Sequence, residues 1–94
     1  MMDNEGRLRE ELARGAKADD LLRNPIFQEA FEIMRSRYAT AWADTSPDDA
    51  GERERLYVAV NVLEDIYDQI VGVMQTGEMA GHELDAGAKG TPVH

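Results

Sequence analysis

Carboxylates at helical spacing are the residues of this sequence with the clearest potential for chemistry. Five of those on the two predicted main helices are candidate ligands: Glu29, Glu32, Glu64, Asp65 and Asp68. Carboxylates on facing helices can hold Mg²⁺ between them. In each predicted helix, however, these acids fall opposite the apolar positions. We therefore expect solvated acidic faces and no metal site.

His82 is the second candidate for chemistry, because Glu78, Glu83 and Asp85 lie near it in sequence. The chain has no cysteine and only one further histidine, His94, so a structural zinc site is not expected and His82 is predicted to be exposed. No catalytic signature accompanies these residues. We expect no catalytic or cofactor-binding residue, no metal ligand and a non-enzymatic function.

The strongest structural pattern is an apolar stripe in the second half of the chain. Its members recur at steps of three and four residues: Leu56, Ala59, Leu63, Ile66, Ile70 and Val73. This spacing predicts one long amphipathic helix. The helix is expected to begin at Pro47 with Ser46 as its cap, or nearer Glu52, and to end at about Gln75, because Thr76-Gly77 is a stop signal.

A second amphipathic helix is predicted from Asn24-Pro25 to about Asp44, since asparagine caps free amides and proline fits the first helical position. Large apolar residues line one side of it and form the predicted hairpin core: Phe27, Phe31, Met34, Tyr38 and Trp42. The short connection to the next helix predicts an antiparallel helical hairpin over residues 24–77.

The two ends of the chain carry weaker signals. Residues 1–23 contain helix formers and few apolar positions, interrupted by Gly15, and predict two short helical pieces or one frayed N-terminal arm. Residues 78–94 have no apolar period and are predicted to be a flexible tail. The predicted fold is all-α: an antiparallel helical hairpin with an additional short N-terminal helix.

The apolar face of the long helix is wider than one facing helix can cover, because further apolar residues flank the stripe. The predicted association surface has eight members: Leu56, Val60, Leu63, Ile66, Tyr67, Ile70, Val71 and Met74. Val58 and Val62 widen the same face. We expect homo-oligomerisation, or docking onto a larger assembly, to complete the fold.

The net charge of the chain limits the kinds of partner that it can bind. The 94-residue chain has a formal net charge of −9, so the acidic hairpin is not expected to contact nucleic acid. Five N-terminal cations are matched by neighbouring acids: Arg7, Arg9, Arg14, Lys17 and Arg23. No apolar run is long enough to cross a bilayer, and the acidic N-terminus is unlike a secretory signal. We expect no membrane partner and an intracellular location.

Three segments carry a resemblance to a known group of proteins: Leu21–Phe31, Gly51–Tyr57 and Met74–Ala80. Together they resemble small α-helical proteins of tailed bacteriophages that are associated with virion assembly and genome packaging. The resemblance covers residues 18–80. Within it, Leu56-Tyr57, Ala59, Asn61, Leu63 and Asp65 are similar to a stretch of the small terminase subunits of short-tailed phages, which form rings. A lysine is typical after Thr76-Gly77, where this chain has Glu78.

The resemblance implies a location in the host cytoplasm or the virion. With the apolar helices, it predicts a non-enzymatic assembly or packaging component that acts through helix-mediated oligomerisation and protein binding. One alternative is an acidic inhibitor that mimics nucleic acid through seven carboxylates: Asp48, Asp49, Glu52, Glu54, Glu64, Asp65 and Asp68. The other is a DNA-binding, terminase-like subunit that uses the N-terminal arginines.

Overall fold

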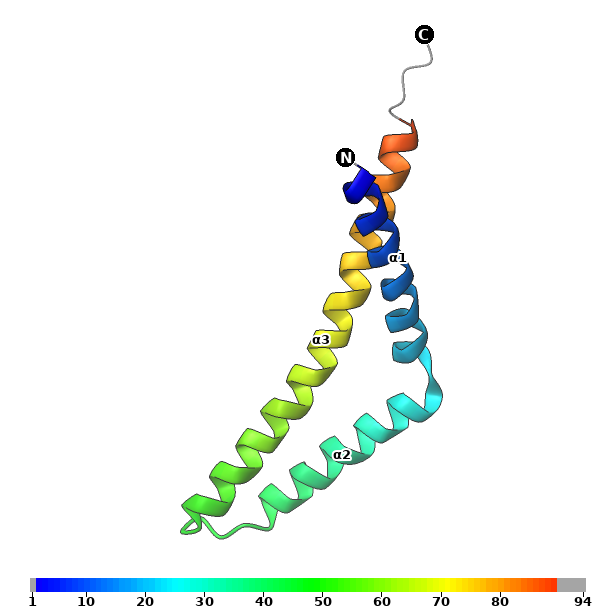
Figure 1. The fold of residues 1–94 in the computed structure, drawn as a ribbon. Helices are drawn as coiled ribbons and strands as arrows, with labels where there is room; N and C mark the ends of the chain where they lie inside the picture. The colour runs from blue at the N-terminus through cyan, green and yellow to red at the C-terminus, as the bar shows by residue number, and fades with distance from the viewer. Residues whose placement is uncertain (1, 90–94) are drawn as a thin grey trace. The chain divides into compact units, whose positions relative to one another are not determined.

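The computed structural model describes residues 2–89 and, within them, the side chains of residues 4–87. It contains three α-helices, α1 (Met2–Arg23), α2 (Pro25–Ala43) and α3 (Ala50–Lys89), and these residues include no β-strand (Figure 1). The predicted all-α class is confirmed. The described helices form two compact units, one from residues 2–22 and 70–89 and the other from residues 23–69, so α3 contributes to both.

The start of α2 follows the predicted signals. The Asn24 side-chain oxygen accepts hydrogen bonds from the backbone N–H groups of Ile26 and Phe27, at 2.8 and 3.1 Å, and Pro25 stands in the first turn. These bonds satisfy two amides that have no partner within the helix. The predicted range of this helix, from Pro25 to about Asp44, is confirmed to within one residue.

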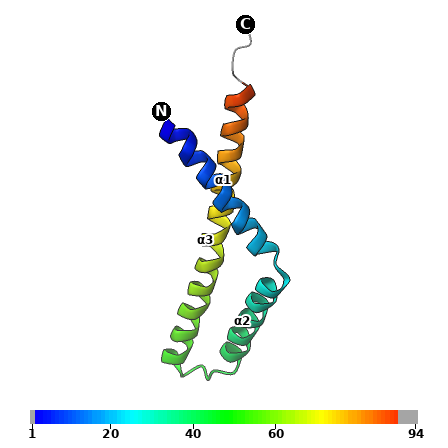
Figure 2. The same cartoon turned by 45° about the vertical axis from the view of Figure 1, so that its right-hand side comes forward.

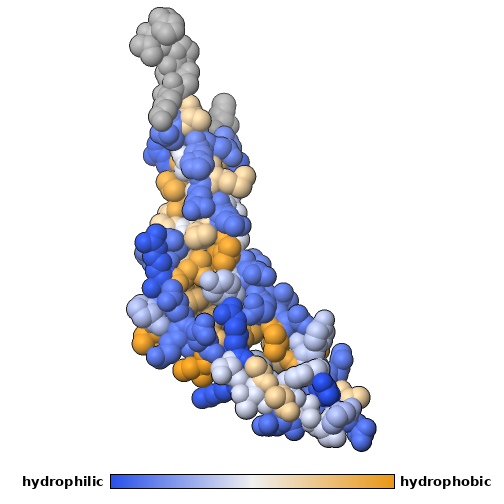
Figure 3. Space-filling view, turned by 180° about the vertical axis from the view of Figure 1, so that it is seen from behind, coloured by the Kyte–Doolittle hydropathy of each residue, from blue (hydrophilic) through white to orange (hydrophobic). Residues whose placement is uncertain are grey.

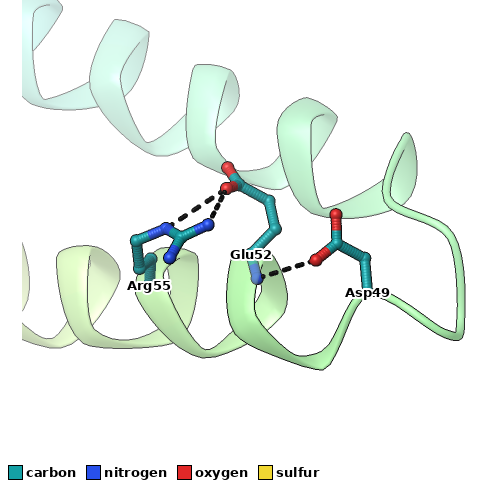
Figure 4. Close-up of polar contacts among 3 residues, drawn as sticks. All are labelled: Asp49, Glu52 and Arg55. Atoms are coloured by element: carbon teal, nitrogen blue, oxygen red, sulfur yellow. Dashed lines mark hydrogen bonds and ion pairs between the residues drawn. The ribbon is translucent and has the colours of Figure 1, made fainter.

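The start of α3 lies between the two predicted positions. Asp49 caps the helix, because its Oδ1 accepts the backbone N–H of Glu52 at 3.1 Å (Figure 4). Ser46, the predicted cap, instead accepts the backbone N–H of Asp48 at 3.3 Å in the preceding turn. The Glu52 carboxylate accepts two hydrogen bonds from the Arg55 guanidinium, at 2.9 and 3.3 Å, which ties the first two turns of α3 together.

In the unit of residues 23–69, α2 and the first half of α3 form an antiparallel hairpin (Figures 1 and 2). Phe31 near the start of α2 contacts Tyr67, and Trp42 near its end contacts Arg53. From the first contact to the second, the residue number rises along α2 and falls along α3. The two helices therefore run in opposite directions. The six-residue connection 44–49 is short enough to impose this arrangement.

In the other unit, α1 packs against the last part of α3 through small residues (Figures 1 and 2). Gly15 and Gly77 meet so closely that a Cβ atom built on Gly15 would lie 2.6 Å from the Cα atom of Gly77. In the same unit, Leu8, Ala18 and Ala80 are buried. Helix axes approach only as far as the side chains between them allow, so the two glycines set this separation.

Two predictions for the ends of the chain are wrong. Gly15 does not interrupt the N-terminal segment, which is one continuous 22-residue helix. The stop predicted at Thr76-Gly77 does not occur either, and residues 78–89 of the predicted tail are helical. Gly77 keeps a negative φ, so it has no left-handed cap geometry and instead supplies a close backbone approach. Residues 90–94 of the predicted tail lie outside the described residues.

The glycine crossing predicts opposite effects for two alanine substitutions in α3. Gly77→Ala places a methyl group against the α1 backbone, and we expect the free energy of unfolding to fall by about 1–3 kcal/mol. Gly72→Ala is the matched control, because its Cβ would meet no other part of the described structure within 4 Å. We expect it to stabilise the protein by about 0.5–1 kcal/mol, since alanine is the better helix former.

Urea denaturation followed by circular dichroism measures both changes. Equal stabilisation by Gly77→Ala and Gly72→Ala would show that α1 does not pack against Gly77.

Candidate association surface

A line of branched apolar side chains is exposed on α3 in the unit of residues 23–69. Val58, Val62 and Ile66 have exposed fractions of 49%, 52% and 49%. Residues four apart lie on one line along a helix, so the three side chains form a continuous ridge, here called the valine ridge. Apolar side chains that reach the surface among polar ones can be seen on the face of the molecule in Figure 3.

The opposite side of α3 packs on α2 through an aromatic cluster. The Phe31 and Tyr67 rings meet edge to face with their centroids 5.4 Å apart. The ring centroids of Phe27 and Phe31 are 4.8 Å apart. Phe31 is the buried residue of α2. Such aromatic pairs add about 0.5–1.5 kcal/mol to the free energy of burial. This cluster holds the hairpin together.

Arg35 extends the aromatic cluster with a polar contact between the helices. Its Nε donates a hydrogen bond of 2.6 Å to the Glu64 carboxylate, and its guanidinium carbon lies 5.4 Å from the Tyr67 ring centroid and 5.7 Å from that of Phe31. The hydrogen bond to Glu64 raises the pKa of Arg35 above its ordinary value, so this side chain stays charged. Both partners are partly exposed, and pairs of this kind contribute little to stability. The contact orients the helices more than it stabilises them.

Beyond Arg35 and Glu64, α2 and α3 enclose an open groove of about 420 Å³. Six residues line it besides this ion pair: Tyr38, Ala39, Trp42, Leu56, Tyr57 and Val60. Val60 and Val62 are two positions apart and therefore about 160° apart around the helix. The groove and the valine ridge are consequently separate surfaces of the same hairpin.

The structure divides the eight residues of the predicted association surface. Ile66 alone among them is exposed, on the valine ridge. Tyr67 packs on Phe31, and Leu56 and Val60 line the groove, so these three belong to the α2 side of the helix. The remaining four are half-buried: Leu63, Ile70, Val71 and Met74.

The residues of the predicted hairpin core differ in burial. Phe31 is buried, and Phe27, Met34 and Tyr38 are half-buried. Trp42 is exposed at 41%, and the Arg53 guanidinium carbon stands 4.1 Å from its ring centroid. The cation covers one face of the indole, while other parts of the ring line the groove.

Three of the seven carboxylates in the predicted acidic mimic have partners within the chain. Asp49 caps α3, Glu52 accepts a hydrogen bond from Arg55, and Glu64 accepts one from Arg35.

Among the described residues, no three histidine, aspartate or glutamate side chains are grouped closely enough to hold a metal ion. His82 is exposed, as predicted, and His94 lies outside the described residues.

The groove and the glycine crossing were not predicted as sites. Tyr57, exposed at 61%, lines the groove although its position lies off the apolar stripe. The sequence does contain a signal for the crossing, namely two pairs of small residues. The members of each pair lie one helical turn apart: Gly15 and Ala18, and Gly77 and Ala80. This spacing puts both small residues of a pair on one helix face.

Comparisons with protein-family models, curated proteins and solved structures find no significant match to this chain. Within residues 2–89, none of the three helices has an apolar stretch long enough to cross a lipid bilayer.

The aromatic cluster predicts that Phe31→Ala destabilises the hairpin far more than Ile33→Ala in the same helix. Phe31 is 8% exposed and contacts two rings, so its truncation should lower the free energy of unfolding by about 3 kcal/mol or more. Ile33 is 43% exposed, and its truncation should cost less than about 1 kcal/mol. Urea denaturation of the two variants measures the difference, and similar losses would contradict the assignment of Phe31 to the core.

Proposed function

We propose that this protein is a non-enzymatic assembly component that self-associates through the valine ridge. The observation that carries the proposal is the exposure of Val58, Val62 and Ile66 on one line of α3. Full burial of an aliphatic side chain contributes about 1.5–3 kcal/mol, so burying the exposed half of each contributes about 1 kcal/mol. The ridge thus favours a bound state over an isolated chain.

A second copy of the chain suits the ridge because its spacing is symmetrical. Val58 and Ile66 lie four residues on either side of Val62. A two-fold axis at Val62 would bring Val58 of one copy opposite Ile66 of the other, as an isologous interface requires. Rows of residues at four-residue spacing also form the ridges that interdigitate in the commonest class of helix packing.

The net charge of −9 opposes this association, since both copies carry it. Asp65 lies on α3 between Val62 and Ile66 and is exposed. Salt screens repulsion between exposed charges and strengthens apolar contacts. The proposed dimer is therefore expected to tighten as the salt concentration rises.

The proposed setting is the assembly or genome packaging of a tailed bacteriophage, on the resemblance of residues 18–80 described above. Detection of the chain in purified virions or proheads tests this setting. The two alternative functions receive less support. Asp49, Glu52 and Glu64 of the proposed mimic are engaged within the chain, and Arg7 and Arg9 of the N-terminal helix are paired with Glu11 and Glu5.

Ile66→Asp tests the ridge as an interface. A charge at the ridge would be buried without a partner in the dimer, and we expect the dissociation constant to rise at least about 100-fold. Because Ile66 is exposed in the single chain, the helical content should stay unchanged. Sedimentation equilibrium measures association, and circular dichroism confirms folding.

Ser36→Asp is the matched control, because it adds the same charge at an exposed position of α2 away from the ridge. We expect it to associate like the unaltered protein. Undiminished association of Ile66→Asp would rule out the valine ridge as the interface.

A further inference from the structure

The groove between α2 and α3 is a second surface, distinct from the valine ridge, and we propose that it binds a basic amphipathic α-helix of another protein. The groove is open, encloses about 420 Å³ and is lined chiefly by apolar and aromatic side chains. This inference rests on the groove and its surroundings and does not depend on self-association through the ridge.

The shape of the site favours a helix as the occupant. Two antiparallel helices leave a long furrow between them, and a third helix laid into it completes a bundle with apolar side chains pointing inward. Trp42 and Tyr57 line the groove with exposed fractions of 41% and 61%. Large aromatic side chains that are exposed at a concave surface are typical of residues that dominate binding energy.

The charge around the loop end of the groove favours a basic partner. Residues 44–55 contain five carboxylates, those of Asp44, Asp48, Asp49, Glu52 and Glu54, and only two guanidinium groups. Arg55 is paired with Glu52, and Arg53 lies on the Trp42 ring and keeps its charge, so residues 44–55 carry a net formal charge of −3.

Glu54 places part of this negative charge beside the groove. It lines a neighbouring hollow of about 420 Å³ that shares Trp42 and Tyr57 with the groove and that Arg53 also lines, with its guanidinium on the Trp42 ring. A helix seated on these two aromatic residues would bring its flanking side chains near Glu54. Lysine or arginine at those positions would be attracted, and acidic residues would be repelled.

A second copy of this chain is a poorer occupant than a basic helix. It would bring the same net charge of −9 to an acidic rim. A concave groove also cannot fit onto itself about a two-fold axis, as an isologous dimer would require. The groove therefore favours a partner whose shape differs from that of this chain and whose charge is positive.

Tryptophan fluorescence tests the proposal directly, because Trp42 is the only tryptophan of the chain and lines the groove. The probe is a synthetic 18-residue amphipathic helix of leucine and lysine, and its control is the same peptide with glutamate in place of lysine. We expect the lysine peptide to shift the Trp42 emission to shorter wavelength and the glutamate peptide to leave it unchanged. Binding should weaken as salt is added, the opposite of the trend expected for the dimer.

Two variants of α2 locate the binding site. Ala39→Leu fills the groove and should weaken binding of the lysine peptide at least about tenfold. Ala30→Leu makes the same change at an exposed position of α2 outside the groove and should leave binding unchanged. Glu54→Lys should weaken binding about threefold or more, because it reverses a charge at the rim.

The same titration in Ile66→Asp separates this proposal from self-association, since that variant alters the ridge and leaves the groove intact. Equal affinity for the two peptides, or full binding by Ala39→Leu, would overturn the proposal. A shift of the Trp42 emission with protein concentration alone in Ile66→Asp would also overturn it, because a second copy would then occupy the groove.

Discussion

The close approach of α1 and α3 at Gly15 and Gly77 is the contact on which the length of both helices depends. Each glycine in a helix interior costs about 1 kcal/mol relative to alanine, and the last twenty residues of α3 contain four of them. The helix α1 is also poor in apolar residues, so neither segment has strong local reasons to remain helical. The crossing offsets this weakness, because backbone contact at the glycines lets Leu8, Ala18 and Ala80 become buried.

The continuity of α3 has a consequence for the surface of the protein. One helix supplies a partner for α1 over its last part and a partner for α2 over its first part. In the hairpin, α2 contacts only the side of α3 that carries Tyr67 and Val60. Val58, Val62 and Ile66 remain outside that contact. Part of the wide apolar face therefore stays exposed, because α2 covers only one side of it.

Local signals were sufficient to predict α2 but not the ends of the chain. The Asn24-Pro25 start and the burial of Phe31 depend on interactions within a few residues or on simple spacing. Glycine gives an ambiguous signal, since Gly77 can end a helix through a left-handed cap or allow another helix to come close. Which of these two roles Gly77 has depends on its contact with Gly15, which lies sixty-two positions earlier in the chain. The division of the apolar face was equally hidden, because Ile66 and Tyr67 are adjacent in sequence and only the contact with Phe31 decides which of them faces α2.

Hydrophobicity and charge act on the two surfaces in different ways. At the proposed valine-ridge interface, burial of branched side chains would favour association while the shared charge of −9 would weaken it, so we expect a modest affinity. At the groove, apolar burial and the acidic rim favour the same partner, provided that it is basic. If both proposed contacts form, charge would distinguish a copy of this chain from a basic partner, although apolar burial would favour both contacts. On these proposals, the acidic composition that disfavours nucleic acid as a partner would also be the source of specificity between proteins.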